Sequence, residues 1–466
     1  MNIPKLSKRL AENLQDGSLL KQIKRLSKDS LFGVIDQGFF STTNFLINIY
    51  FGRWLSESDY GAYAIVFTIF LILSTFQSSL IFEPMAVFGP GDFHSNGKTY
   101  FKSLVMMQIV ITTGISVLLL VSSVFAAQPM KNPLMSLAVS ITFILLYWFF
   151  RQACYVESRP GIAAITSALY SAFTLGGLFF CRRFGLTQAA TPFLLMAAGS
   201  LVASAAAILL LQARLTSDHK LSLRQIFIVH WEYGKWFLAS TIPNSISTFI
   251  YIPMIGVMIG LTYSGAYRAI QNLVLPLQQI FAVLTLLFLP RLSKLKYAGD
   301  EKGVARTSLV FLVVNTTVLI GFFAVLIPFR AILVTLLYQN AFYTSFASLV
   351  PLWGISLFLA ILIQTITNLL RISKLSRYVL YAKIGSASVV LLAGFLFIRR
   401  FHLTGALAAI LVSMVVELVI LTLLYFQPRG GGISAEHHPL PMDAVEEPGE
   451  VDMMITGLQL RTEGDE

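Results

Sequence analysis

Polar side chains recur at helical spacing inside long apolar stretches of this sequence, and they are the residues best suited to chemistry. One face of the 32–52 stretch carries, at i, i+4, i+7 and i+11, the residues Gln37, Ser41, Asn44 and Asn48, with Asp36 beside them. Amides and hydroxyls are costly in lipid, so such a face looks towards other helices or a water-filled cavity. There these groups can bind a polar ligand through hydrogen bonds.

Three other stretches carry a similar face. They hold Ser240, Asn244, Ser247, Thr248 and Tyr251 in 234–258, Arg268, Gln271, Asn272 and Gln279 in 264–290, and Gln364, Thr367, Asn368 and Arg371 in 346–370. The alternative explanation is that Ser, Thr and Asn only hold helices together, which is common in membrane bundles. We favour ligand binding, because four long faces are more than helix association requires.

The elements that position these faces are apolar runs of about 20 residues, the length that crosses a bilayer. Apolar residues make up 56% of the 466 residues and charged residues 12%, and the mean hydropathy is +0.74. The runs cover 32–52, 61–84, 101–126, 132–152, 161–181, 190–213, 234–258, 264–290, 305–328, 346–370, 378–398 and 403–426. They are continuously apolar and do not alternate, so they predict an all-α polytopic membrane protein with about twelve helices.

Basic residues predict the orientation, because they accumulate on the cytoplasmic side. With the N-terminus inside, 26 Lys and Arg fall on cytoplasmic segments, Lys383 among them, and seven on outward loops. The cytoplasmic segments include a basic N-terminal segment (1–31), a linker (214–233) and an acidic tail (427–466) that is expected to be disordered. The net charge of +11 is therefore explained by topology, and no nucleic-acid partner is needed.

The sequence also contains an internal repeat. Gly-Ala-Tyr occurs at 61–63 and again at 265–267, an offset of 204, while "FCRRFGLT" (180–187) and "FIRRFHLT" (397–404) are offset by 217. The extra residues fit 329–345, which is expected to be a short amphipathic surface helix and loop. Two lobes of six helices, 32–213 and 234–426, then relate by an axis along the membrane normal and form a V-shaped central cavity, a design typical of alternating-access transporters.

Patterns for cofactor or metal binding do not occur in the sequence. CxxC, GxxxxGK[ST], HExxH and GxSxG are all missing, and the six histidines have no ligand spacing. Cys154 and Cys181 fall in or at the ends of apolar runs, where packing is the expected role. We therefore expect neither a cofactor, nor a metal, nor a catalytic constellation.

Three segments resemble the polysaccharide flippases of the multidrug/oligosaccharidyl-lipid/polysaccharide exporter superfamily: "YFGRWLSESDYGAYAIVFTIF", "GAYRAIQNLVLPLQQIFAVLTLLFLPRLSKL" and "FHLTGALAAILVSMVVELV". The resemblance covers roughly 30–426. It implies a cavity lined largely by helices 1, 2, 7 and 8, and translocation of an undecaprenyl-diphosphate-linked sugar across the bacterial inner membrane. It also implies O-antigen or exopolysaccharide cargo, and as partners membrane lipids and the polymerase or glycosyltransferases of the same pathway.

Within this resemblance the repeated motif is mostly structural, but its arginine is not. Gly61 and Gly265 allow a tight turn or a close approach, and Tyr63 and Tyr267 are expected at the membrane interface. Arg268 aligns with Ala64 of the first half, so the fold does not demand it. A diphosphate suits its planar donors, and snorkelling to the outer surface is the alternative.

The predicted substrate-binding residues are Arg268, Gln271, Asn272, Asn44, Asn48, Asn244 and Arg371. Asp36 is the coupling candidate, with three roles left open: neutralising Arg268, accepting a coupling proton, or neither, at the cytoplasmic interface. Glu417 lies away from the polar faces and is expected to pair internally.

Two other functions share some of these features. A cation-coupled multidrug exporter has the same fold, but cationic cargo calls for an acidic cleft, which Arg268 and Arg371 argue against. A membrane-embedded polysaccharide polymerase needs a large outward loop with clustered Arg, His or carboxylates, and the outward loops here are short.

The charge distribution generates a first testable prediction. Reporter fusions after residues 30, 220, 300 and 427 should all report a cytoplasmic location, because basic residues cluster at each of these points or at the loop that contains it. A periplasmic signal from any one of the four would contradict the twelve-helix topology.

Overall fold

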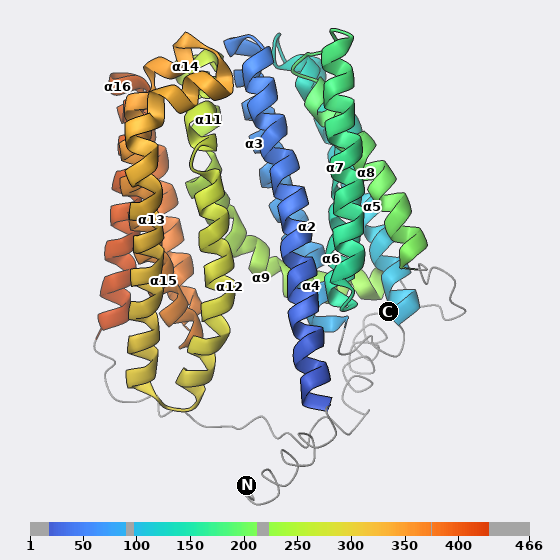
Figure 1. Ribbon diagram of the computed structural model, residues 1–466, viewed down its shortest axis with the longest axis vertical. Helices are drawn as coiled ribbons and strands as arrows, with labels where there is room; N and C mark the ends of the chain where they lie inside the picture. Colours follow the sequence, from blue (N-terminus) through green and yellow to red (C-terminus); the bar gives the residue numbers. More distant parts are fainter. Residues whose placement is uncertain (1–17, 90–96, 212–222, 374, 428–466) are drawn as a thin grey trace, which may run out of the picture. The chain divides into compact units, whose positions relative to one another are not determined.

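A computed structural model of the chain describes residues 18–89, 97–211, 223–373 and 375–427 (Figure 1). Within these ranges every regular element is a helix, as predicted. Residues 1–17 of the basic segment, 214–222 of the linker and 428–466 of the acidic tail lie outside the described residues. The second part of the basic segment is continuous with the first long helix, which begins at Ser18.

The first half of the chain forms one group of packed helices. They are α2 (Ser18–Trp54), α3 (Glu57–Gln77), the π-helical turn η1 (Ser78–Phe82), α4 (Glu83–Phe88), α5 (Gly97–Phe125), α6 (Lys131–Val156), α7 (Pro160–Arg183) and α8 (Thr191–Leu210). Helix α7 packs along α2, and α6 packs against both α5 and α8.

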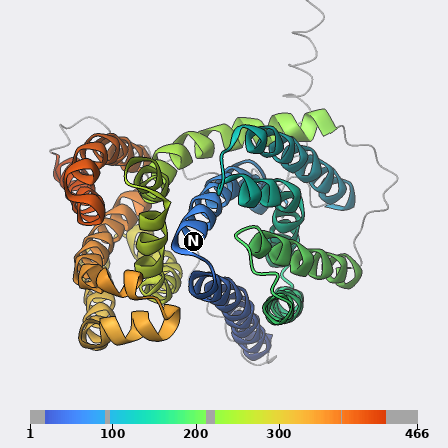
Figure 2. The same cartoon turned by 90° about the horizontal axis from the view of Figure 1, so that it is seen from above.

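The second half begins with a helix that crosses to the first. Its elements are α9 (Leu223–Phe249), α10 (Tyr251–Met258), α11 (Leu261–Asn272), α12 (Leu275–Tyr297), α13 (Glu301–Tyr338), α14 (Ala341–Ser345), η2 (Ala347–Leu349), α15 (Val350–Ile372) and α16 (Ser376–Phe426). Helix α9, light green in Figure 2, packs on η1, α4 and α5 of the first half. There His230 is buried, and its ring nitrogens contact the Tyr100 hydroxyl at 2.9 Å and the Leu80 carbonyl at 3.1 Å.

The described helices confirm a multi-pass membrane protein. Nine are long and apolar enough to cross a membrane, or ten if the bent pair α9 and α10 is one span. Helix α2 is not among them, because its polar face lowers its hydropathy. Helix α16 reverses at His402, whose backbone is non-helical, so that Lys383 meets Glu417 across a hairpin. Each of the twelve predicted runs overlaps one or more of the described helices, while the count of twelve crossings stays a prediction.

The repeated glycines lie where the two halves cross. Helix α3 packs on α11 more extensively than any other pair that joins the halves. A Cβ on Gly61 would overlap with the Leu261 carbonyl, and one on Gly265 would come within 2.9 Å of the Glu57 carbonyl oxygen. Glu57 and Leu261 are themselves 204 residues apart, so the two contacts are reciprocal. The motif recurs because each copy packs against the other.

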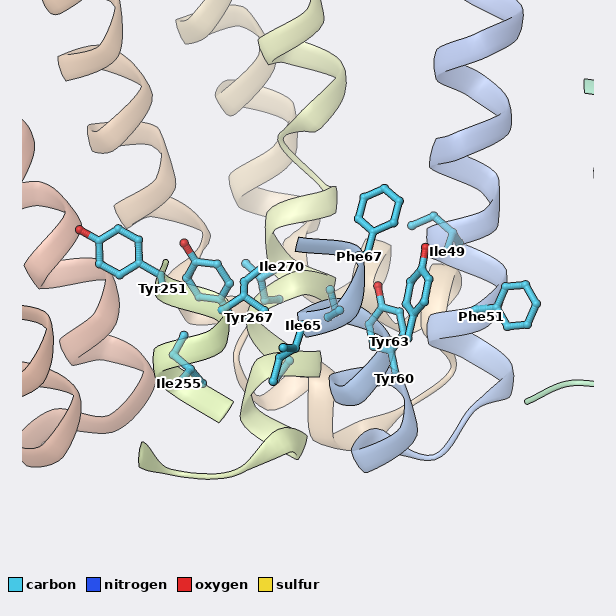
Figure 3. Packing of buried hydrophobic residues seen from close by; sticks show 14 of the residues in the cluster. Ile49, Phe51, Tyr60, Tyr63, Ile65, Phe67, Tyr251, Ile255, Tyr267 and Ile270 are labelled. Carbon is cyan, nitrogen blue, oxygen red and sulfur yellow. The ribbon is translucent and has the colours of Figure 1, made fainter. Parts of the chain in front are cut away.

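The repeated tyrosines pack inside the protein, and the expectation of an interfacial position is wrong. Tyr63 is fully buried, and its ring centroid is 5.5 Å from that of Phe193. Tyr267 is 3% exposed and packs at 5.5 Å from Trp353. Figure 3 shows both rings among the apolar side chains of α3, α10 and α11.

The second repeated motif contains a residue with a positive φ angle at the same place in both halves. Gly185 has φ +68° and His402, its equivalent at the offset of 217, has φ +52°. This left-handed region suits glycine far better than histidine. The motif therefore marks the reversal between consecutive helices, at α7–α8 and inside α16.

The segment 329–345 is mostly exposed or half-buried, as expected of an amphipathic surface element, but its buried face packs into the protein. It forms the end of α13 and the short helix α14, and Tyr338 and Tyr343 are completely buried against Tyr60 of α3. The residues that break the repeat thus pack between the two halves. The described residues up to Tyr425 form one compact unit, and the division into two lobes stays a prediction.

The crossing of α3 and α11 generates a second prediction. Gly61→Ala should lower the free energy of unfolding by about 1–3 kcal/mol, because the added methyl group meets backbone that can move only if the helices separate. The measurement is denaturant unfolding in detergent micelles.

Gly114→Ala in α5 is the matched control, because a Cβ there meets nothing within 4 Å. It should be neutral or stabilising by up to about 1 kcal/mol, since alanine favours helix over glycine. Equal stability of the two variants would contradict a tight crossing.

Candidate functional site

A cavity of about 800 Å³ lies between helices of the two halves. It is lined from α2, α3 and α6 on one side, and from α9, α10, α11, α12, α15 and α16 on the other. The lining expected from helices 1, 2, 7 and 8 is therefore present, and α15 and α16 add to it. Its walls combine amides, hydroxyls and aromatic rings, including Trp148 and Trp353.

Arg268 lies at the cavity wall, 5% exposed. Its Nε donates to Asn48 Oδ1 at 3.2 Å, its Nη1 donates to Gln271 Oε1 at 2.9 Å, and its guanidinium lies 5.0 Å from the centre of the Phe67 ring. No carboxylate from the described part of the chain forms an ion pair with it. The positive charge is thus held by neutral groups and is available to an anion.

Helix α2 holds its polar face by hydrogen bonds along its own backbone. Asn44 donates to the Phe40 carbonyl at 2.9 Å and accepts from the Tyr170 hydroxyl at 3.1 Å. Asn48 donates to the Asn44 carbonyl at 2.8 Å, which leaves its Oδ1 for Arg268. Both asparagines line the cavity, as do Arg268 and Gln271 among the predicted residues.

Three predicted binding residues do not line the cavity. Asn272 is fully buried and donates to the hydroxyls of Tyr60 and Tyr338, at 3.0 Å each. Asn244 and Arg371 are exposed, away from the cavity wall. Asn272 does not face the cavity, because its amide nitrogen donates to the tyrosines of the crossing, a contact that helical spacing alone does not reveal.

Asp36 has a partner that the sequence analysis did not identify. Arg151 of α6 donates to both of its carboxylate oxygens, at 2.6–2.9 Å, and also reaches Gln37 at 2.7 Å. Tyr155 and Ser167 donate to the same carboxylate at 2.5 Å. Asp36 is completely buried and paired with Arg151, so it does not neutralise Arg268, and its role in coupling stays a prediction.

Two cavity residues were assigned elsewhere by sequence reasoning. Lys383 was counted among cytoplasmic loop residues, and Glu417 was placed away from the polar faces. Both line the cavity, 2.8 Å apart, which confirms the internal pairing expected of Glu417. The signal that could have found them is their spacing around the reversal at His402, which brings the limbs of α16 together.

The halves are also joined by polar contacts beside the crossing. Asn340 donates to Glu57 at 2.8 Å, and Arg53 donates to Gln339 at 2.9 Å. Together with the Asn272 bonds, they link α2 and α3 to the segment from α11 to α14. These contacts close one end of the space between the halves.

Comparison with known proteins identifies relatives of this arrangement. Residues 51–347 match the family model described as polysaccharide biosynthesis protein. No curated protein sequence matches the chain.

Solved transporter structures share the fold. A multidrug resistance MATE family transporter of the MOP superfamily, inward-facing, superposes with a TM-score of 0.70 at 13% identity, over 84% of this chain and 97% of its own. The lipid II flippase MurJ, in an inward closed conformation, superposes with a TM-score of 0.69 at 13% identity, over 84% of this chain and 87% of its own. A MOP superfamily transporter from Pyrococcus furiosus with a binding pocket of reversed polarity superposes with a TM-score of 0.61 at 13% identity, over 86% of this chain and 95% of its own.

The buried pair of Asp36 and Arg151 generates a third prediction. Asp36→Asn should lower the free energy of unfolding by about 3–5 kcal/mol, because it leaves a buried guanidinium without its counter-charge. The double variant Asp36→Asn/Arg151→Gln should recover most of that loss, measured by denaturant unfolding.

Glu301→Gln is the control, because Glu301 is 68% exposed in its pair with Lys296. Its effect should stay within about 1 kcal/mol. Full stability of Asp36→Asn would show that the pair does not anchor α2 to α6.

Proposed function

The chain belongs to the polysaccharide biosynthesis protein family that its residues 51–347 match, and on that premise we propose that it is a flippase. It moves a polyprenyl-diphosphate-linked oligosaccharide from the cytoplasmic to the outer leaflet for exopolysaccharide or O-antigen assembly. The protein is located in the bacterial inner membrane, and both of its termini are cytoplasmic.

The observation that carries this proposal is the unpaired Arg268 in the cavity wall. A diphosphate offers oxygens in the geometry that a guanidinium fork binds best, and the low-dielectric surroundings strengthen such a bond. The neutral partners Asn48 and Gln271 orient the guanidinium without cancelling its charge. The lipid diphosphate is the part of the cargo that all polyprenyl-linked glycans share, so one cation serves any sugar sequence.

The remaining lining fits a glycan. Gln37, Gln278 and Gln279 supply amides, several serines supply hydroxyls, and Trp148 and Trp353 supply flat apolar faces. Sugars present hydroxyls at their edges and C–H groups on their faces, so a wall of this mixed kind binds them without a fixed charge.

Translocation by alternating access requires the two halves to separate at one end. The contacts that would break first are those of Asn340 with Glu57, Arg53 with Gln339, and Asn272 with Tyr60. All are neutral or singly charged hydrogen bonds, of the kind that exchange readily for water. The helices of 32–213 and 234–426 would act as the two moving lobes, and pathway enzymes such as the polymerase would receive the cargo.

Multidrug export is the second candidate, because the MATE transporter has the same fold. The charged residues that line the cavity, Arg268, Lys383 and Glu417, sum to one positive charge. This charge repels the organic cations that such exporters commonly carry, and it favours an anionic headgroup.

A fourth prediction tests the proposed binding of the diphosphate by Arg268. In cells that depend on this protein for polysaccharide export, Arg268→Ala should abolish export and leave the lipid-linked oligosaccharide in the cytoplasmic leaflet, with its synthesis intact. Arg268→Lys should recover export only in part, because an ammonium supplies charge without the bidentate fork. Leaflet location is measured by the accessibility of the glycan in sealed vesicles.

Arg291→Ala is the matched control, because Arg291 is exposed near the end of α12 and does not line the cavity. It should export normally. Full export by Arg268→Ala at matched protein levels would contradict the proposed binding of the diphosphate by Arg268, and extension of a glycan by purified protein from an activated sugar would contradict the flippase function.

A further inference from the structure

A charged pair lines the cavity and takes no part in the proposed binding of the diphosphate by Arg268. Lys383 and Glu417 lie on opposite limbs of the α16 hairpin, with Lys383 Nζ 2.8 Å from Glu417 Oε1. The Glu417 side chain is 4% exposed and that of Lys383 is 24% exposed, so the carboxylate is the deeper of the two. Both face the same cavity as Arg268.

Glu417 has fewer hydrogen-bond donors around it than Asp36, the other buried carboxylate among the described residues. Asp36 accepts hydrogen bonds from Arg151, Tyr155 and Ser167. Glu417 Oε1 accepts none from any described residue, and the ammonium of Lys383 approaches it outside hydrogen-bonding geometry. Ser413, one turn away, donates instead to the Ile410 carbonyl. Among the described residues, Lys383 alone therefore supports the charge of Glu417.

The charge balance of the cavity changes when cargo binds. A diphosphate that links a lipid to a sugar is a diester and carries two negative charges. Without cargo, the residues that line the cavity carry a net charge of +1, because Glu417 cancels one of the two positive charges of Arg268 and Lys383. If Lys383 turned to the diphosphate, the two cations would match its charge, but Glu417 would be left buried without a partner, a state that costs several kcal/mol. A buried carboxylate in that position takes up a proton instead.

We propose that Glu417 is a proton-binding site coupled to cargo, in which Lys383 leaves the carboxylate for the diphosphate as Glu417 takes up one proton. This inference rests on the flippase function proposed above. The loaded cavity is then electrically neutral, and unloading returns Lys383 to Glu417 and releases the proton. The titratable and charged groups that line the cavity together with Glu417 are Lys383 on α16, Tyr251 on α10, and Tyr267 and Arg268 on α11; no other carboxylate lines the cavity in the described part of the chain.

A proton suits this site better than a metal cation. A bound metal ion requires several oxygen ligands, and the described residues contain no group of three or more His, Cys, Asp or Glu that could hold one. A proton requires only the one carboxylate. The coupling also has a sign: because loading takes up a proton, cargo should bind more tightly as the pH falls.

The test measures proton uptake on binding. Farnesyl-diphospho-glucose, a short diester whose phosphates do not titrate near neutral pH, is added to the purified full-length protein in weakly buffered detergent solution with a pH indicator. The wild type should take up about one proton for each ligand bound. The dissociation constant of the diester should rise about tenfold for each unit by which the pH is raised, over the pH range in which binding takes up a proton.

Glu417→Gln should bind the diester without proton uptake and with an affinity independent of pH. Lys383→Met should show a protonated carboxyl in its infrared spectrum before any ligand is added, and the double variant Lys383→Met/Glu417→Gln should lack that band. Glu232→Gln is the control, because Glu232 is exposed on α9 in a surface pair with Lys235. Its proton uptake should equal that of the wild type.

The outcomes separate the two proposals. Binding of the diester by the wild type without proton uptake, or unchanged uptake in Glu417→Gln, overturns the proton site and leaves the flippase function standing. A sodium requirement without proton uptake also overturns it. Failure of the wild type to bind the diester at all, at any pH, overturns both proposals.

Discussion

The structure depends on one close approach, the crossing of α3 and α11, where backbone meets backbone between the two halves. Gly61 and Gly265 make this possible, because a side chain at either position would hold the helices apart. Arg268 lies one turn beyond Gly265, and Phe67, whose ring faces its guanidinium, lies two turns beyond Gly61. The same contact that joins the halves therefore fixes the cation of the cavity against the opposite half.

Desolvation explains why the cavity is built from neutral dipoles around few charges. An arginine enclosed by protein must be hydrogen-bonded, but a carboxylate partner would cancel the charge that an anion recognises. Asn48 and Gln271 meet both requirements, since each accepts a hydrogen bond from the guanidinium and neither carries a charge. Asp36 shows the opposite arrangement, a carboxylate enclosed by an arginine and two hydroxyls. It suits an anchor between α2 and α6 better than a site that gains and loses ligands.

Local periodicity predicted what depends on single helices. The polar face of α2 and the cavity position of Arg268 follow from helical spacing and from a mismatch between repeats. The partners did not follow, because they are set by packing between distant segments: Arg151 is 115 residues from Asp36. Lys383 was misplaced for a different reason. Counting basic residues treats each as a topological signal, and a lysine just inside a helix end counts the same as one in a loop.

The charges of the cavity and of the Asp36–Arg151 pair occur where the two repeats differ. At the offsets of 204 and 217, Arg268 corresponds to Ala64, Lys383 to Thr166, and Glu417 to Ser200; Asp36 corresponds to Ser240 and Arg151 to Asn368. The glycines, the tyrosines and the helix reversals are shared, because they build the crossing and the hairpins that both halves need. A symmetric cavity would present the same groups from both sides and could not place a cation opposite a glycan wall. Divergence at these few positions gives each half a different role, with a fixed ion pair in the first and the charged wall of the cavity in the second.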